Sequence, residues 1–135
     1  MTSGTWEGGC LCGAVRYRFT GELRELLYCH CRMCQRAGGT PVVAWMTLST
    51  SGLQWTGRPP ASYQSSASAR RFFCAACGSP LAFQADDEPD QIDLTIASLD
   101  DPARAAPTYH AWVSSRLPWF ETSDDLPRHE QASAT

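Results

Sequence analysis

The chain has 135 residues, of which 43% are hydrophobic, a net charge of -3 and a pI near 5.5. We therefore expect a single globular domain, residues 1–135, with its core over about residues 6–127, rather than a disordered chain. The acidic balance argues against nucleic-acid binding, and the absence of a long apolar run argues against a membrane partner. Residues 1–6 are polar and do not resemble a secretory signal, so a cytoplasmic location with reduced thiols is expected.

Glycines and prolines divide the chain into short segments, most of which have strand patterns. In chain order, we expect strands at residues 14–19, 26–29, 41–48, 53–55, 61–65, 70–73, 80–84 and 91–97. The segment 41–48 is rich in β-branched and aromatic residues, which predicts a central strand. One helical turn is expected at 32–37, irregular structure after 109–113, and a frayed, disordered tail at 128–135. The sum is an all-β domain of eight to ten short strands.

Two of the three cysteine groups predict a closed metal site. Cys10 and Cys12 form one pair, and Cys74 and Cys77 form the other, about sixty residues later. Each pair can reach one ion from a single turn, and two pairs complete a tetrahedral thiolate site, so we expect a structural zinc here. Iron and a redox dithiol at Cys74 and Cys77 are the alternatives. A disulfide framework is disfavoured, because the cysteine count is odd and no export signal precedes it.

The third group predicts an open metal site. Cys29, Cys31 and Cys34 lie on one short segment, and three thiolates around zinc leave one position for a substrate. Zinc bound by three thiolates is a poor activator of water but suits a substrate thiol. His30 alternates with its neighbours, so we expect it to face away from the metal. The alternatives are a fourth ligand from His30 or His110, or a cluster without metal; His110 is either a nearby proton donor or an ordinary buried histidine.

These motifs resemble the glutathione-dependent formaldehyde-activating enzyme (GFA) and centromere protein V family. The resemblance rests on GCLCGAVRY at 9–17, CHCRMC at 29–34, RFFCAACGSPL at 71–81 and HAWVSSR at 110–116, and it runs from about Trp6 to Pro127. It implies an Mss4-like (β-tent) fold of short antiparallel strands with two zinc ions per chain. It also implies a structural zinc on Cys10, Cys12, Cys74 and Cys77, and a catalytic zinc on Cys29, Cys31 and Cys34.

The resemblance further implies a carbon–sulfur lyase that joins glutathione to formaldehyde. We therefore expect an enzyme that adds a small thiol, such as glutathione, to an aldehyde, with the thiolate bound to the three-cysteine zinc. Four arginines are either partners for the carboxylates of glutathione or ordinary surface residues: Arg16, Arg32, Arg71 and Arg116. The alternative function is a zinc-stabilised, non-catalytic binding module. A serine hydrolase is disfavoured, because the sequence has no G-x-S-x-G motif.

Overall fold

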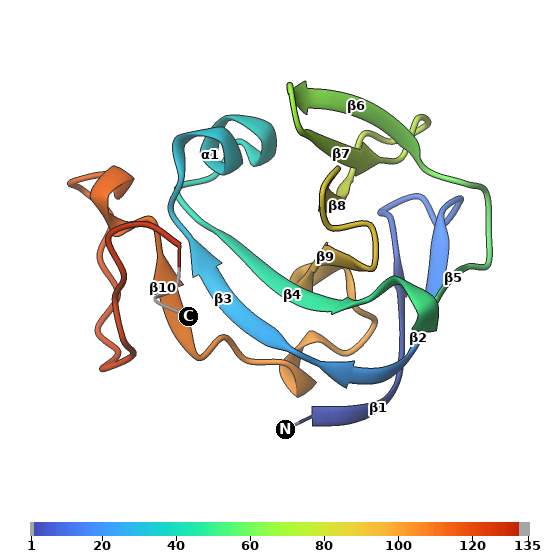
Figure 1. Ribbon diagram of the computed structural model, residues 1–135, viewed down its shortest axis with the longest axis horizontal. Helices are drawn as coiled ribbons and strands as arrows, with labels where there is room; N and C mark the ends of the chain where they lie inside the picture. The colour runs from blue at the N-terminus through green and yellow to red at the C-terminus, as the bar shows by residue number, and fades with distance from the viewer. Residues whose placement is uncertain (1, 133–135) are drawn as a thin grey trace.

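The computed structural model describes residues 2–132, and strands dominate it (Figure 1). The strands are β1 (Thr2–Gly9), β2 (Arg16–Leu23), β3 (Glu25–Cys29), β4 (Val43–Ser49), β5 (Leu53–Trp55), β6 (Ala61–Ser66), β7 (Ala69–Phe73), β8 (Pro80–Ala85), β9 (Gln91–Thr95) and β10 (Tyr109–Ala111). One short helix, α1 (Arg32–Gly38), follows β3, and single 3-10 turns occur at Thr50–Gly52, Ile96–Ser98, Pro102–Arg104 and Val113–Ser115. Each segment that the sequence predicted as a strand overlaps one of these strands, so the all-β class is confirmed.

The strands form two sheets. A small sheet has the order β1-β2-β5, and a larger one has the order β10-β3-β4-β9-β8-β7-β6. All pairs are antiparallel except β10 with β3, which is parallel. β4 lies inside the larger sheet between β3 and β9, as its β-branched and aromatic composition predicts. In Figure 1 the small sheet lies at one end of the molecule, and α1 and β10 lie at the other.

The core lies where the small sheet packs against the larger one. Alternate residues of β2, Tyr17 and Phe19, are buried together with Trp6 of β1. They pack against Met46 of β4 and Leu94 of β9, whose side chains alternate with those that face the opposite side of the larger sheet. Burying a side chain of this size contributes about 1.5–3 kcal/mol. One face of the larger sheet is therefore committed to the core, and the other face remains for a site.

Two segments differ from the prediction. β1 was not expected, because its residues are mostly polar and only Trp6 shows a core pattern. It pairs with β2 along its whole length, from Thr2 opposite Leu23 to Gly9 opposite Arg16. β1 is an edge strand of the small sheet, it contains three glycines, and Trp6 is the one large buried side chain among its described residues, so the sequence signal is weak.

The expected tail also behaves differently over residues 128–132. The backbone N–H of His129 donates to the carbonyl of His110 (2.9 Å), and the N–H of Trp112 donates to the carbonyl of Gln131 (2.8 Å). This segment therefore packs against β10 and the turn after it instead of fraying from Arg128. Residues 133–135 lie outside the described part of the chain. No helix of residues 2–132 has the length and apolar character needed to cross a membrane.

Candidate functional site

Four cysteines from two distant turns meet at one point. Cys10 and Cys12 lie in the turn between β1 and β2, and Cys74 and Cys77 lie in the turn between β7 and β8. Their sulfur atoms all lie within 4.8 Å of one another, and we call them the four-cysteine cluster. Gly13 follows the first pair at φ +82 and Gly78 follows the second at φ +79, a backbone region that favours glycine. The cluster therefore connects the small sheet to the larger one.

The geometry of the four-cysteine cluster fits a tetrahedral ion. The Cys10 and Cys12 sulfurs are 3.7 Å apart, and the Cys12 and Cys74 sulfurs are 3.8 Å apart. Four sulfurs at about 2.3 Å from a zinc ion have an edge of about 3.8 Å. Backbone N–H groups of Val15 and Cys77 donate to the Cys10 and Cys74 sulfurs at 3.2 and 3.4 Å, which stabilises thiolates. All seven cysteines are free of disulfides.

The three remaining cysteines also converge, and we call them the three-cysteine cluster. Cys29 ends β3, Cys31 is the N-cap of α1, and Cys34 lies within the first turn of that helix. Their sulfurs lie within 4.8 Å of one another. The Cys31 sulfur accepts from the backbone N–H of Cys34 (3.3 Å), so helix capping fixes the Cys31 thiol on the helix that carries Cys34. Gln35 donates to the His30 carbonyl (2.8 Å) and holds this loop on the helix.

The electrostatics of the three-cysteine cluster fit a cation. Hydrogen bonds from Cys29 and Cys31, followed by the guanidinium of Arg71, lower the pKa of Cys34 to about 2. Hydrogen bonds with Cys31 and Cys34, followed by burial, raise the pKa of Cys29 far above its ordinary value. The three sulfurs therefore oppose one another's ionisation. Loss of all three protons needs a positive charge between them, which a divalent metal provides.

Neither histidine belongs to the three-cysteine cluster. His30 and His110 are both buried, and His30 Nε2 lies 2.8 Å from His110 Nδ1. His30 faces away from the thiols, as its alternation with Cys29 and Cys31 predicted. Among the described residues, the grouped ligand atoms at this position are three sulfurs and no imidazole nitrogen. The described residues thus offer three sulfur ligands at this position, which would leave one position of a tetrahedral ion open.

A hydrogen-bonded chain continues from these histidines. His110 Nε2 lies 3.1 Å from Asp124 Oδ1, and Tyr28 stacks on the His110 ring with centroids 4.8 Å apart. With Asp124 accepting from Nε2–H, His110 Nδ1 accepts from His30 Nε2–H. Burial, followed by His110 and nearby arginines, lowers the pKa of His30 to about 4, so its ring is neutral. His110 is thus a buried, fully partnered histidine, and Asp124 is a member that the sequence did not reveal.

A cleft of about 880 Å³ opens over the three-cysteine cluster. The register of the larger sheet forms the floor of the cleft, because the side chains of one cross-strand row all face the cleft. The row consists of Glu25, Thr47, Asp93, Phe83 and Arg71. Arg71 lies over the Phe83 ring (5.1 Å), and its guanidinium donates to the Cys34 sulfur (3.5 Å). The cleft therefore places a fixed cation beside the thiols.

Asp93 lies at the middle of this row, opposite Thr47 and Phe83. Its carboxylate accepts from the Thr47 hydroxyl at 2.6 Å. Burial raises its pKa from 3.8 to about 6, an effect that Thr47 reduces and that the charges of Cys34, Glu88 and Glu25 increase. A carboxyl group with a pKa near neutrality can both take and give a proton. The sequence signal was the alternation of β9, in which Asp93 lies between two core positions and must face the opposite side.

The four predicted arginines separate into two groups. Arg71 and Arg32 line the cleft, and Arg32 also donates to Gln35 (3.1 Å). Arg16 forms a bidentate pair with Asp100 at 2.9 and 2.6 Å, outside the cleft. Arg116 donates to backbone carbonyls after β10, including that of Phe120 (2.6 Å). Two of the four are therefore positioned to meet a substrate there, and two serve the fold.

Comparisons with known proteins agree with this geometry. The family model for the glutathione-dependent formaldehyde-activating enzyme (GFA) matches residues 5–115, a range that includes all seven cysteines. A Schizosaccharomyces pombe protein named as an uncharacterized lyase is 35% identical over 81 residues, which cover 58% of this chain and 56% of that protein. The match thus spans little more than half of the relative's own length.

The fold is also found in a solved structure. The crystal structure of a Rhodobacter sphaeroides protein matches with a TM-score of 0.57 and 22% identity. The match covers 90% of this chain and 98% of the other. At this level of identity the likeness concerns the fold alone.

Proposed function

The chain belongs to the glutathione-dependent formaldehyde-activating enzyme family, and from this premise we propose that it is a zinc-dependent carbon–sulfur lyase. It would add a small thiol, such as glutathione, to an aldehyde, such as formaldehyde. The observation that carries the proposal is the convergence of Cys29, Cys31 and Cys34 at the wall of a large cleft. We further propose a cytoplasmic location, because the thiols must stay reduced.

The cysteines have separate roles in this proposal. The four-cysteine cluster, Cys10, Cys12, Cys74 and Cys77, would hold a structural zinc, because four thiolates close the coordination sphere. The three-cysteine cluster, Cys29, Cys31 and Cys34, would hold the second zinc. When bound there, zinc would supply a cationic site that accepts a substrate thiol and favours its deprotonation.

The remaining chemistry falls to residues of the cleft. The Asp93 carboxylate would take the proton from the thiol, directly or through one water, and return it to the oxygen of the adduct. The Arg71 guanidinium would donate to the aldehyde oxygen as it gains negative charge, since it already lies 3.5 Å from the Cys34 sulfur. Arg32 and Arg24, on the walls of the same cleft, would orient a carboxylate-bearing thiol.

The test measures adduct formation from glutathione and ¹³C-formaldehyde by NMR, with the zinc content determined in parallel. We expect acceleration over the uncatalysed rate and two zinc ions per chain. Cys34→Ser should lose the acceleration and one zinc, while Arg36→Ser, an exposed neighbour on α1, should keep both. With two zinc ions bound and no acceleration, the proposal would fail in favour of a zinc-stabilised binding module.

A further inference from the structure

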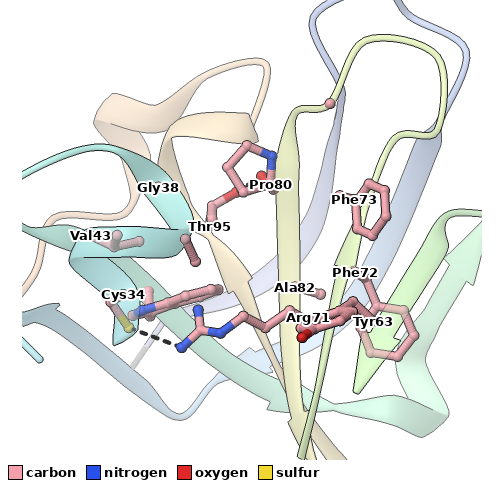
Figure 2. A pocket seen from close by; sticks show the side chains of 13 residues that line it. Cys34, Gly38, Val43, Tyr63, Arg71, Phe72, Phe73, Pro80, Ala82 and Thr95 are labelled. Atoms are coloured by element: carbon pink, nitrogen blue, oxygen red, sulfur yellow. Dashed lines mark hydrogen bonds between the residues drawn. The ribbon is translucent and has the colours of Figure 1, made fainter. Parts of the chain in front are cut away.

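A second cavity of about 300 Å³ adjoins the three-cysteine cluster. It lies between α1 and β4 on one side and β7 and β8 on the other (Figure 2). Three of its lining residues, Cys34, Trp45 and Arg71, also line the large cleft. The two spaces therefore meet at these side chains. Figure 2 shows Arg71 extending to the Cys34 sulfur at this boundary.

The lining of the second cavity is mostly apolar away from that boundary. Its walls include Val43, Phe72, Phe73, Pro80 and Ala82. Its charged lining residue, Arg71, turns its guanidinium to Cys34. The hydroxyl of Thr95 is already bonded to the Pro80 carbonyl (3.3 Å). The other side-chain hydroxyl of the lining belongs to Tyr63, which is largely exposed. A charged group would lose hydration in this cavity and find no opposite charge there, whereas an uncharged apolar group would gain contacts.

The two spaces suit different reactants. The cleft presents both signs of charge, with Arg24 and Arg32 among its cations and Glu25 and Glu88 among its anions, which suits a charged thiol. The second cavity has about ten times the volume of roughly 30 Å³ that one water takes in the liquid. Formaldehyde has two heavy atoms and no substituent, so it would leave almost all of this cavity unfilled. A ligand pocket of this size holds a larger apolar group.

We propose that this cavity receives the apolar substituent of an aldehyde, so that the electrophiles of this protein are apolar aldehydes larger than formaldehyde. The inference rests on the proposed function and names its substrate class. In the reaction R–SH + R′–CHO → R–S–CH(OH)–R′, a sulfur–carbon bond forms and the carbonyl π bond breaks. The proton leaves sulfur and ends on oxygen, and nothing is oxidised or reduced. The carbonyl lies at the boundary beside Arg71, and R′ extends past Cys34 into the cavity.

The first experiment compares straight-chain aldehydes from acetaldehyde to pentanal, with glutathione as the thiol and zinc-loaded protein. These aldehydes differ in length more than in intrinsic reactivity, and uncatalysed rates are measured for each. One buried methylene changes an equilibrium or rate ratio by about fourfold. The three methylenes added from acetaldehyde to pentanal should therefore raise kcat/KM by about tenfold when they are partly buried and by about sixtyfold when they are fully buried.

Two matched variants locate the effect. Ala37 is exposed on α1 and lines the second cavity, so Ala37→Leu narrows it with a residue that favours helix. In this variant the ratio of kcat/KM for pentanal to that for acetaldehyde should fall to below about threefold. Ala67 is exposed in the turn between β6 and β7, outside both spaces, and Ala67→Leu should keep the full ratio. Because each ratio is taken within one variant, differences in zinc content cancel.

A binding measurement adds a readout that needs no turnover. Titration with 1-butanol, followed by NMR, should shift the methyl signals of Val43 and Ala82 in the wild type and less so in Ala37→Leu. A flat aldehyde series with active turnover of formaldehyde, or no shift at these methyl groups, would overturn the inference and leave the proposed function intact. Failure of every aldehyde, formaldehyde included, would overturn both.

Discussion

Replacing Asp93 with asparagine should stabilise the protein while removing its proposed acid. Burial raises the pKa of this carboxyl from 3.8 to about 6, which means that the folded state disfavours the charged form. A shift of this size corresponds to about 3 kcal/mol at a pH well above 6. Asparagine retains an oxygen that can accept from the Thr47 hydroxyl, now at 2.6 Å, and carries no charge to desolvate.

The sign of the pH dependence follows from proton binding. Between pH 3.8 and about 6 the folded state binds more protons at Asp93 than the unfolded state, so wild-type stability falls as the pH rises through this window. The gain from Asp93→Asn should be about 1.6 kcal/mol at pH 5.0 and about 3 kcal/mol at pH 7.5. Urea unfolding of both proteins at the two pH values, with zinc in excess, measures the difference of about 1.4 kcal/mol.

The control is Asp87→Asn, an exposed aspartate in the turn before β9. Its effect on stability should be within about 0.5 kcal/mol, as is usual for an exposed substitution. Activity should fall for Asp93→Asn and persist for Asp87→Asn. If the gain from Asp93→Asn were equal at pH 5.0 and 7.5, the carboxyl would not be desolvated as described, and its assignment as the acid would lose its basis.

Three further outcomes are expected. Cys12→Ser should lose one zinc and most of the cooperative unfolding transition seen by circular dichroism, because a structural zinc site contributes about 10–16 kcal/mol in small peptides. As a control, replacement of the exposed neighbour, Leu11→Ser, should change the free energy of unfolding by less than about 0.5 kcal/mol. Arg71→Ala should lower kcat/KM for adduct formation by about 10²–10³ with two zinc ions retained, and a loss of zinc instead would indicate a structural role. His110→Ala should lower the free energy of unfolding measured in urea by about 1–3 kcal/mol, because buried His30 loses its hydrogen-bond partner. Asp124→Asn should lower it by less, since the amide oxygen can still accept from His110 Nε2–H.

The sequence predicted the two cysteine clusters because the spacing of their members is mostly local. Two cysteines that lie two or three residues apart can bind the same ion from one turn. Cys29, Cys31 and Cys34 span the end of a strand and the start of a helix, and this spacing brings their three sulfurs together. The sequence also predicted that the Cys10–Cys12 pair meets the Cys74–Cys77 pair, because these four cysteines remain once the group of three is set apart. Local spacing therefore predicted the clusters without any knowledge of how the strands pair.

The meeting of Asp93 and Arg71 in one cleft was not predictable in this way, although Arg71 was among the candidate arginines. Arg71 and Asp93 are 22 residues apart and become neighbours of the same cleft because β7, β8 and β9 pair in one register, with Phe83 between them. A shift of one residue in that register would turn either side chain to the core face. The alternation of β9 in the sequence predicted that Asp93 faces away from the core. The order in which the strands pair was not predicted, so the residues that surround Asp93 could not be named.

The pairing order also links the four-cysteine cluster, which has no chemical step in the proposed function, to the three-cysteine cluster. β7 carries Arg71 to the Cys34 sulfur and ends two residues later, directly before Cys74 of the four-cysteine cluster. That cluster attaches the end of β7 to the turn after β1, so a metal there would fix the strand that bears the cation. β7 is covered on one edge by β6 alone, and neither strand contributes much to the core. A metal in the four-cysteine cluster would therefore help to hold Arg71 in place, together with the pairing of β7 with β6 and β8 and the contact of Arg71 with the Phe83 ring.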